Sequence, residues 1–576
     1  MEQNIEAKIE QWLTGPYDQA TKDTIKALVE SKNEAELTDS FYKNLEFGTG
    51  GLRGLMGVGS NKVNIYTIAT ATQGLSNYLL ATYPGQPIKV VVAYDSRNNS
   101  QLFAQTTAAV FSANGIHVYL FAELRPTPQL SFAIRQLGAQ SGVVITASHN
   151  PKEYNGYKAY WNDGGQIIAP HDKNIIGEVD KIASYADVKA DANQALITML
   201  GADMDNAYLD YLQTLSISKE AIARQSGLKI IYSSIHGTGI TLVPKILARM
   251  GFTNVQVVEA QATPDGNFPT VVYPNPEERE AMSMALALAK QENADLIIAT
   301  DPDADRVGMG LRNADGEYVL LNGNQTASIL FFYMLEAWKN AGKLDGHQML
   351  VKTIVTTDLL DKIAADYGVN CYNTLTGFKY IAGVIGAKEG KEKFICGGEE
   401  SYGYLIGDQV RDKDAIVSCA MIAEMVAYAK DKGQSLFDFL VSIYSKYGFY
   451  HEDLISITKK GKTGTEEIAE MMKQLRANPP ASLGGQAVVR LLDYSTGKDK
   501  NLATKAETAM DFEKSNVLQF LCADGTKVSA RPSGTEPKIK FYFSVVSSFT
   551  TGDTILAKTA DAEARIKVIQ KELNLI

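Results

Sequence analysis

The chain has 576 residues, more than one hydrophobic core normally organises, so we expect several domains and exclude a single small module. Hydrophobic residues make up 45% of the sequence and charged residues 21%, a balance that is typical of a globular protein with a large core. The net charge of -10 opposes an extended grip on a nucleic-acid backbone, although local anion sites remain compatible with it.

The first residues and the cysteines indicate a reducing, intracellular setting. The segment 1–13 carries acids where a signal peptide has basic residues, and Ile5, Ile9 and Leu13 recur at helical spacing. None of the four cysteines lies in a CxxC pair. No apolar run approaches the roughly 20 residues that cross a bilayer. We therefore expect a soluble cytoplasmic protein with neither a membrane nor a nucleic acid as partner.

Three stretches of the sequence share one plan, in which short runs rich in Val and Ile alternate with segments of helical periodicity. This pattern predicts an α/β unit used three times. The expected strands cover 89–95, 117–124 and 142–148, then 229–237, 255–260 and 295–301, and finally 348–358, 369–377 and 393–401. In each stretch the last strand runs into a polar loop, and functional groups gather at such carboxyl edges of α/β sheets.

After about residue 450 the pattern changes to alternating strands, such as 488–495 and 539–547, followed by an amphipathic helix over 561–575. We interpret this part as a smaller α+β domain. The expected domain ranges are 1–190, 191–315, 316–448 and 449–576.

The first polar loop reads TASHNPKEYNGYK and covers 146–158. Ser148 follows a buried strand directly, which makes it a candidate nucleophile if a neighbour takes its proton or a cation stabilises its anion. The alternative is a helix-capping serine beside a structural histidine. Because adjacent residues usually point in different directions, we do not expect Ser148 and His149 to form a protease-like dyad.

The second polar loop, DPDADR, places carboxylates at every other position after a strand, at Asp301, Asp303 and Asp305. Three carboxylates so close repel one another unless a cation neutralises them, and Mg²⁺ suits all-oxygen ligands. A calcium loop or a solvated acidic turn is the alternative. An EF-hand is disfavoured because Arg306 stands where its turn glycine belongs.

Two further loops offer groups that bind sugars and phosphates. GGEESYGY (397–404) carries two glutamates and a serine that suit sugar hydroxyls, with a solvated turn as the alternative. A glycosidase acid/base pair is disfavoured because adjacent glutamates cannot usually flank one bond. RPSGTEPK (531–538) combines an arginine, two hydroxyls and a glycine, the mixture that a phosphate requires, with an ordinary Pro/Gly turn as the alternative. FGTGGLRG (47–54) is a similar glycine-rich segment, but it is no convincing dinucleotide fingerprint.

In this order TASHNP, DPDADR, GEES and RPSGTEP resemble the phosphoserine, metal, sugar and phosphate loops of the α-D-phosphohexomutase superfamily. The superfamily includes phosphoglucomutases, phosphomannomutases and phosphopentomutases, and with FGTGGLRG at the front the sequence is most similar to the phosphoglucomutase and phosphopentomutase branch. The resemblance implies an α/β fold of three related α/β domains with mixed sheets and a smaller C-terminal α+β domain, all around a central cleft.

The resemblance also implies roles for individual residues. Ser148 would carry the phosphoryl group, and Asp301, Asp303 and Asp305 would hold Mg²⁺ together with an oxygen of that phosphoserine. Arg53, His149 and Lys158 would lie near the phosphoserine, where they stabilise charge or move a proton. The remaining implied residues bind the substrate: Thr376, Gly377, Glu399, Ser401, Lys413, Arg531, Ser533, Gly534 and Thr535.

We therefore expect a cytoplasmic phosphoglucomutase that interconverts glucose 1-phosphate and glucose 6-phosphate through a phosphoserine and a bisphosphorylated sugar. Its cofactors would be Mg²⁺ and traces of glucose 1,6-bisphosphate, and its partner a small phosphosugar, with the chain a monomer or a weak homo-oligomer. A phosphomannomutase or phosphopentomutase is the alternative within the class. A phosphosugar phosphatase or a non-catalytic phosphosugar-binding protein is the alternative outside it.

Overall fold

The computed structural model describes residues 3–48, 50–313, 315–459, 461–533 and 537–576. The chain divides into two compact units and passes between them several times. The first unit consists of Met1–Gly323, Ala382–Gly397 and Ser401–Gly433, and the second of Asn324–Ile381, Gly398–Glu400 and Gln434–Ile576. No helix within the described residues is long and apolar enough to cross a membrane.

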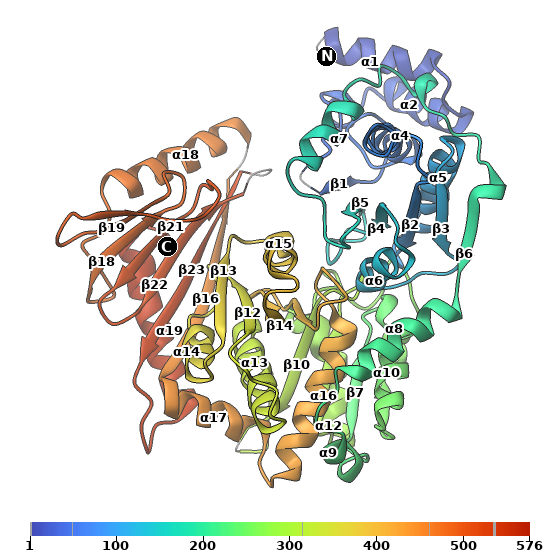
Figure 1. Ribbon diagram of the computed structural model, residues 1–576. Helices are drawn as coiled ribbons and strands as arrows, with labels where there is room; N and C mark the ends of the chain where they lie inside the picture. Colours follow the sequence, from blue (N-terminus) through green and yellow to red (C-terminus); the bar gives the residue numbers. More distant parts are fainter. Residues whose placement is uncertain (1–2, 49, 314, 460, 534–536) are drawn as a thin grey trace. The chain divides into compact units, whose positions relative to one another are not determined.

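A mixed six-stranded sheet forms the centre of the first α/β domain, with the strand order β1-β5-β4-β2-β3-β6 (Figure 1). Its strands are β1 (Gly51–Leu55), β2 (Lys89–Tyr94), β3 (His117–Phe121), β4 (Ser141–Ile145), β5 (Tyr154–Trp161) and β6 (Ile197–Leu200). β2 is parallel to β3 and β4, whereas β5 runs antiparallel to β4 and to β1. The polar loop after β4 therefore leads straight back into the sheet.

Helices cover both faces of this sheet, and the central strands β2 and β4 are therefore buried on both sides. α4 (Ile65–Thr82) packs against α5 (Ser100–Ala113) and α7 (His171–Val179), while α6 (Thr127–Leu137) packs on β2 and β4. At the amino end, α1 (Gln3–Thr14), α2 (Gln19–Glu30) and α3 (Glu34–Phe41) build a separate small core around Trp12 and Phe41.

The second α/β domain has a five-stranded sheet with the order β11-β10-β9-β7-β8. Its strands are β7 (Ile230–Ser233), β8 (Val255–Val257), β9 (Leu296–Thr300), β10 (Val307–Arg312) and β11 (Tyr318–Leu321). Its helices are α8 (Ala202–Thr214), α9 (Lys219–Arg224), α10 (Val243–Met250), α11 (Glu259–Ala262) and α12 (Arg279–Glu292). The acidic loop lies between the antiparallel strands β9 and β10.

Elements of the third α/β domain contribute to both units. β14 (Lys393–Gly398), β15 (Tyr404–Ile406) and the largely buried α16 (Ala415–Asp431) follow α15 (Phe378–Lys388), and α16 packs on α9 and α10 of the first unit. The second unit holds α13 (Gly323–Asn340), α14 (Leu359–Asp366) and the parallel pair β12 (Gln348–Thr353) and β13 (Asn370–Thr374). Short 3-10 turns cover Tyr185–Asp187, Gln194–Leu196 and Thr238–Thr241.

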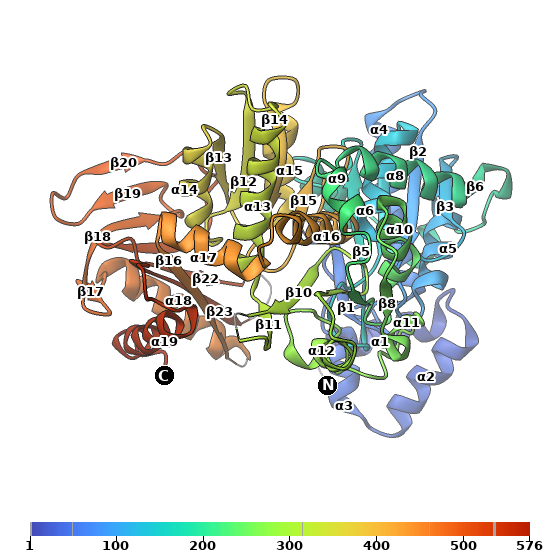
Figure 2. The same cartoon turned by 90° about the horizontal axis from the view of Figure 1, so that it is seen from below.

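The C-terminal part of the second unit is one antiparallel sheet with the order β16-β23-β22-β21-β18-β19-β20 (Figure 2). Its strands are β16 (Phe449–Thr458), β17 (Ser482–Leu483, paired with β18), β18 (Gln486–Asp493), β19 (Lys498–Asn501), β20 (Glu507–Ala509), β21 (Leu518–Cys522), β22 (Lys527–Pro532) and β23 (Lys538–Ser547). α17 (Leu436–Tyr447), α18 (Gly461–Ala477) and α19 (Ile555–Glu572) accompany it, and α19 packs on β16 and β23.

Two sequence-based predictions about local structure need correction. The expected strand 142–148 ends at Ile145, so Ser148 lies in a turn rather than at the end of a strand. The expected loop 146–158 ends before Tyr154, because Tyr154–Trp161 form β5. Lys158 therefore projects from a strand and not from a loop. The Asn and Gly within this strand are weak strand formers, which explains why the sequence alone favoured a loop.

Candidate functional site

Ser148 occupies a strained turn just beyond the carboxyl end of β4. Its φ of +52° lies in the left-handed region that residues with a side chain rarely adopt. The residue is buried, and its amide donates to Thr146 Oγ1 at 2.8 Å. Its hydroxyl donates to Asp301 Oδ2 at 2.9 Å. The turn thus points the serine at the acidic loop of the second domain, within the first unit.

His149 lies against the same hydroxyl, with 3.1 Å between Ser148 Oγ and His149 Nδ1. The prediction that these neighbouring side chains point in different directions is wrong. The positive φ of Ser148 turns its side chain toward that of the next residue. Burial, followed by the nearby charges of Arg306 and Arg53, lowers the pKa of His149 well below its ordinary value. The imidazole is therefore neutral near pH 7.

The three carboxylates of the acidic loop lie together and buried, at Asp301, Asp303 and Asp305. One oxygen from each falls within 4.8 Å of the others. Burial, and then the charges of its two neighbours, raises the pKa of Asp301 well above its ordinary value. So concentrated a negative charge is unfavourable without cations.

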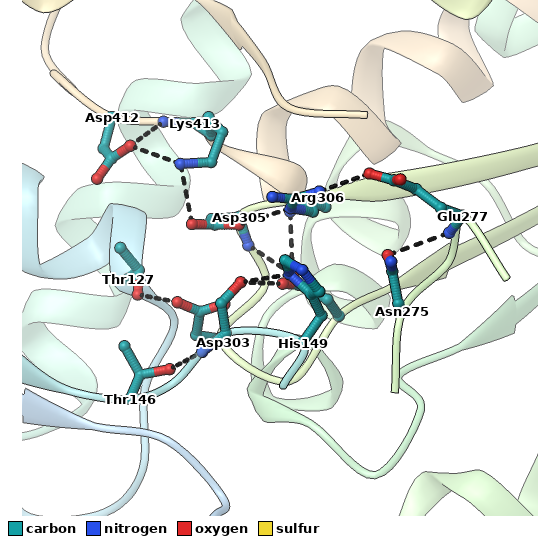
Figure 3. Close-up of polar contacts among 12 residues, drawn as sticks. Thr127, Thr146, His149, Asn275, Glu277, Asp303, Asp305, Arg306, Asp412 and Lys413 are labelled. Carbon is teal, nitrogen blue, oxygen red and sulfur yellow. Dashed lines mark hydrogen bonds and ion pairs between the residues drawn. The ribbon is translucent and has the colours of Figure 1, made fainter. Parts of the chain in front are cut away.

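Two lysines from different domains face this cluster, and Figure 3 shows one of them, Lys413. Lys158 Nζ lies 2.8 Å from Asp303 Oδ2 and 3.2 Å from Asp305 Oδ2. Lys413 Nζ lies 3.0 Å from Asp305 Oδ2 and 3.1 Å from Asp412 Oδ1. Although burial opposes the shift, the two lysines and Arg306 hold the pKa of Asp305 below its ordinary value. The loop therefore keeps anionic oxygens at neutral pH.

The donor set fits a hard divalent cation. Asp303 Oδ1 and Asp305 Oδ1 are buried, and neither has a hydrogen-bond partner among the described residues. A buried carboxylate oxygen without a partner is costly, and a cation satisfies it. All of the offered ligand atoms are carboxylate oxygens, which suits Mg²⁺. Backbone amides hold the carboxylate of Asp301 in place, because its Oδ1 accepts hydrogen bonds from the amides of Asp305 and Arg306.

Neighbouring elements fix the acidic loop from outside (Figure 3). Thr127, at the first position of α6, donates from its hydroxyl to Asp303 Oδ2 at 2.9 Å and from its amide to Asp303 O at 2.9 Å. Arg306 forms an ion pair with Glu277 at 2.5 Å. Through these contacts, α6 of the first domain and Glu277 of the second domain hold the acidic loop in position.

Arg53 completes the part of the site on the first sheet. It projects from β1, which pairs with β5, and its Nη1 donates to Asn150 Oδ1 at 3.3 Å. Arg53 thus contacts the turn that carries Ser148. The structure brings Arg53, Ser148, His149, Lys158, the three aspartates and Lys413 together within the first unit.

The predicted sugar-binding residues are divided between the units. Thr376, Gly377 and Glu399 belong to the second unit, where the amide of Gly377 donates to Glu399 Oε1 at 3.0 Å and Thr376 Oγ1 is buried without a hydrogen-bond partner among the described residues. Ser401 belongs to the first unit. Glu400 accepts from the hydroxyls of Thr353 and Thr356, so it is held by its own unit.

The predicted phosphate loop follows the end of β22. Arg531 lies on this strand opposite Lys540, and the amide of Ser533 donates to Lys538 O at 2.7 Å. Gly534 and Thr535 lie outside the described residues. Arg531 therefore lies at the end of β22, and Ser533 follows this strand directly.

Sequence reasoning missed the residues that hold the site. Thr127 contacts the acidic loop from a distant part of the chain, Asp412 accepts from the Tyr160 hydroxyl and from the amide of Lys413, and Arg97 donates to the backbone of the Ser148 turn. A signal existed only for Arg97, because YDSR follows the strand 89–94 at the same sheet edge as Ser148.

Models of one known protein family match most of the chain. Models of phosphoglucomutase/phosphomannomutase α/β/α domains I, II and III match residues 44–186, 206–314 and 322–447. A phosphoglucomutase of Staphylococcus haemolyticus is 38% identical over 506 residues, which cover 88% of this chain and 91% of the relative. One from Staphylococcus epidermidis is 35% identical over 549 residues, 95% of this chain and 98% of the relative.

Solved structures share the fold at low identity. Parafusin, a phosphoglucomutase from Paramecium, aligns with a TM-score of 0.70 at 17% identity and covers 92% of this chain and 95% of its own. A phosphoglucomutase/phosphomannomutase family protein from Burkholderia thailandensis aligns with a TM-score of 0.65 at 18% identity, covering 92% and 97%. The predicted class of three α/β domains with mixed sheets and a sheet-rich C-terminal domain is confirmed. The chain belongs to the phosphoglucomutase/phosphomannomutase family.

Proposed function

We propose that the chain is a phosphoglucomutase, an isomerase-class phosphotransferase that interconverts glucose 1-phosphate and glucose 6-phosphate through a phosphoserine at Ser148. The observation that carries this proposal is the contact of Ser148 Oγ with Asp301 Oδ2 at 2.9 Å, beside two buried carboxylate oxygens that have no hydrogen-bond partner in the described part of the chain. It supports the proposal because phosphoryl transfer needs a nucleophilic oxygen at the edge of a cation site.

Mg²⁺ held by Asp301, Asp303 and Asp305, with an oxygen of phosphorylated Ser148, would withdraw charge from the transferring group. Ser148 gives its phosphoryl group to a sugar hydroxyl, and the serine oxygen is the leaving group. After the bisphosphorylated sugar has reoriented, Ser148 Oγ attacks its other phosphate and the monophosphate leaves. Atoms and charge balance over the two transfers, and no nucleotide takes part.

The groups around Ser148 supply charge stabilisation and proton transfer. His149 is neutral and reaches Ser148 Oγ at 3.1 Å, so it can accept or return a proton at Nδ1. Lys158 stays charged because Asp303 and Asp305 outweigh the effect of burial and raise its pKa. It therefore balances the charge of the carboxylates, together with Arg53 near the turn.

The remaining predicted residues are proposed to bind the substrate. Lys413 lies at the acidic loop, where it can contact the phosphate of the sugar. Glu399, Thr376 and Gly377 lie side by side through the contact of Gly377 N with Glu399 Oε1, and they suit sugar hydroxyls together with Ser401. Arg531, Ser533, Gly534 and Thr535 would hold the phosphate that does not react.

Glucose is the proposed sugar because the relatives at 35–38% identity are named phosphoglucomutases and extend over most of this chain. Glucose 1,6-bisphosphate is the proposed activator, since a trace of it can phosphorylate Ser148. Phosphomannomutase and phosphopentomutase activities are tested in the same experiment.

The test is ³¹P NMR of the purified chain with Mg²⁺ and a trace of glucose 1,6-bisphosphate, with glucose, mannose and ribose 1-phosphates in competition. We expect the glucose 6-phosphate signal to grow fastest, with no inorganic phosphate. A faster mannose 6-phosphate or ribose 5-phosphate signal would replace the proposed sugar. Release of inorganic phosphate would indicate a phosphatase, and unchanged spectra would contradict the enzyme assignment.

A further inference from the structure

One side chain, that of Arg97, donates hydrogen bonds to several backbone carbonyls in and next to the turn that carries Ser148. Arg97 Nη1 donates to the carbonyls of Pro151 at 2.8 Å and Tyr154 at 3.1 Å. Arg97 Nη2 donates to the carbonyl of Ser148 at 2.6 Å and also to that of Asn150. One planar guanidinium thus binds three carbonyls of the turn and that of Tyr154, the first residue of β5.

Arg97 is itself fixed from two sides. It is buried, and Asp95 accepts from the amide of Arg97 at 2.9 Å and from the Ser100 hydroxyl at 2.7 Å, while its other oxygen lies 3.4 Å from Arg97 Nε. On the opposite side, the guanidinium carbon lies 5.1 Å from the centre of the Phe268 ring. An aromatic face attracts a guanidinium without competing for its donors.

Phe268 belongs to the second α/β domain, whose loop presses closely on the residues after Asp95. A Cβ at Gly266 would come within 2.2 Å of the Asn98 amide nitrogen, so only glycine fits there. Asn98 Nδ2 also donates to Asn267 Oδ1 at 3.1 Å. The loop that holds Arg97 in place therefore belongs to the same domain as the acidic loop, within the first unit.

A left-handed φ at a serine is unfavourable and persists only where surrounding contacts enforce it. At Ser148 this φ sets the direction of the hydroxyl toward Asp301. If the carbonyls of the turn lost their donor, the turn would relax to conformations in which Ser148 Oγ no longer points at the carboxylates. The four bonds need donors spread over a plane, which arginine has and lysine lacks.

We propose that Arg97, held between Asp95 and the Phe268 ring, is a positioning residue that fixes the reactive direction of the Ser148 hydroxyl and couples it to the second domain. This inference rests on the proposed function, in which Ser148 carries the phosphoryl group. Among the described residues, Arg97 forms no hydrogen bond or ion pair with the three carboxylates of the acidic loop or with the Ser148 hydroxyl, so its effect is on the rate of transfer rather than on substrate binding.

The test compares Arg97→Lys with Arg312→Lys. Arg312 is a matched control, because its Nε and Nη2 donate to the carbonyl of Ala294 and its guanidinium lies 5.2 Å from the Tyr318 ring. It stands at the far end of β10 from the acidic loop. We expect Arg97→Lys to lower kcat at least 10-fold with KM unchanged, and Arg312→Lys to leave both within 2-fold.

Two further measurements separate positioning from loss of fold. Phe268→Leu keeps all four carbonyl bonds and removes only the aromatic face, so we expect about a 3-fold loss of kcat. In Arg97→Ala, added guanidinium ions should restore part of kcat, and ammonium ions should not. Circular dichroism of each variant establishes that it is folded.

The outcomes distinguish this inference from the proposed function. If the parent chain acquires no phosphoserine at Ser148, the proposed function fails. If the parent is phosphorylated and active but folded Arg97→Lys keeps the parental kcat, the positioning role of Arg97 is overturned. The same holds if Arg97→Lys does not fold and Phe268→Leu keeps the parental kcat.

Discussion

Each unit contains a cluster in which lysines pair with carboxylates, and the carboxylates are buried in the first cluster but partly exposed in the second. In the first unit, Asp301, Asp303 and Asp305 face Lys158 and Lys413. In the second unit, Lys352 lies 3.1 Å from Asp358 and 3.0 Å from Asp361, and Lys527 lies 2.7 Å from Asp358. Both clusters tie segments that are far apart in the sequence.

The difference lies in what is left unsatisfied. In the second cluster Lys352 also donates to Thr356 O and Lys527 to Ile354 O, and none of its side-chain polar atoms is buried without a hydrogen-bond partner among the described residues. In the first cluster, by contrast, Asp303 Oδ1 and Asp305 Oδ1 are buried without hydrogen-bond partners among the described residues. A satisfied cluster stabilises the fold, whereas one with spare anionic oxygens is prepared for a ligand.

The largest effect should come from Ser148→Ala. The variant removes the oxygen that carries the phosphoryl group, and we expect the mutase rate to fall by about 10³-fold or more. The thermal midpoint should stay within a few degrees of the parent, because Ser148 lies in a turn. A rate close to that of the parent in the ³¹P assay would contradict covalent transfer through this residue.

Asp303→Asn tests the unsatisfied cluster directly. We expect activity to fall by about 10²-fold or more, because a cation loses an anionic ligand. In metal-free buffer the free energy of unfolding should change by less than about 1 kcal/mol, since the variant also relieves repulsion among the carboxylates. Urea unfolding measures this quantity. A large loss of stability would make the first cluster structural, like the second.

Arg531→Ala compares a structural and a substrate-binding role on the same strand. β22 carries Lys527 of the satisfied cluster and Arg531 of the predicted phosphate loop. Loss of a charge-assisted contact to phosphate should raise KM about 10-fold to 100-fold. Stability should not change measurably. Steady-state kinetics with parental KM would remove Arg531 from the substrate site.

Asp358→Asn should have the opposite signature. It removes a charged partner from two buried lysines, and we expect a loss of about 2 kcal/mol in the free energy of unfolding, which allows for the partial exposure of Asp358. The mutase rate per folded molecule should be unchanged. Reduced turnover with parental stability would reverse the roles assigned to the two clusters.

The smallest effect is a pH dependence beside the satisfied cluster. Burial raises the pKa of Glu452 to about 7 from its ordinary value of 4.5, even though Lys527 acts in the opposite direction. The folded state therefore binds more protons than the unfolded state between about pH 4.5 and pH 7, and this contribution to stability is lost as the pH rises through that range.

In Glu452→Gln this loss disappears, because the amide does not ionise. At pH 8 the variant should be more stable than the parent by about 1–2 kcal/mol, and at pH 4.5 the two should be nearly equal. Thermal unfolding across this pH range provides the comparison. Parallel curves for the two proteins would contradict the raised pKa.

The sequence predicted those parts of the fold and the site that are contiguous in the chain. The hydrophobic strands and the acidic loop could be recognised because strand, loop and ligand-bearing residues follow one another directly. Ser148 was identified for the same reason. The four domain ranges and the individual site roles stay predictions.

The rest depends on contacts across the chain. Arg97 acts on carbonyls about fifty residues away, and Thr127 on a residue of another domain. The orientation of His149 follows from the backbone of Ser148, which its sequence neighbourhood does not reveal. The satisfied cluster could not be distinguished from the unsatisfied one either, because sequence shows charges but not which of their atoms lack partners.

The most direct test of the account is to follow a phosphoryl group through Ser148. The chain is labelled from radioactive glucose 1,6-bisphosphate in the presence of Mg²⁺, mapped by tandem mass spectrometry, and then chased with unlabelled glucose 1-phosphate. We predict one label, on Ser148, that passes to the sugar at the rate of turnover. A label on another residue, or one on Ser148 that the sugar does not remove, would contradict the account.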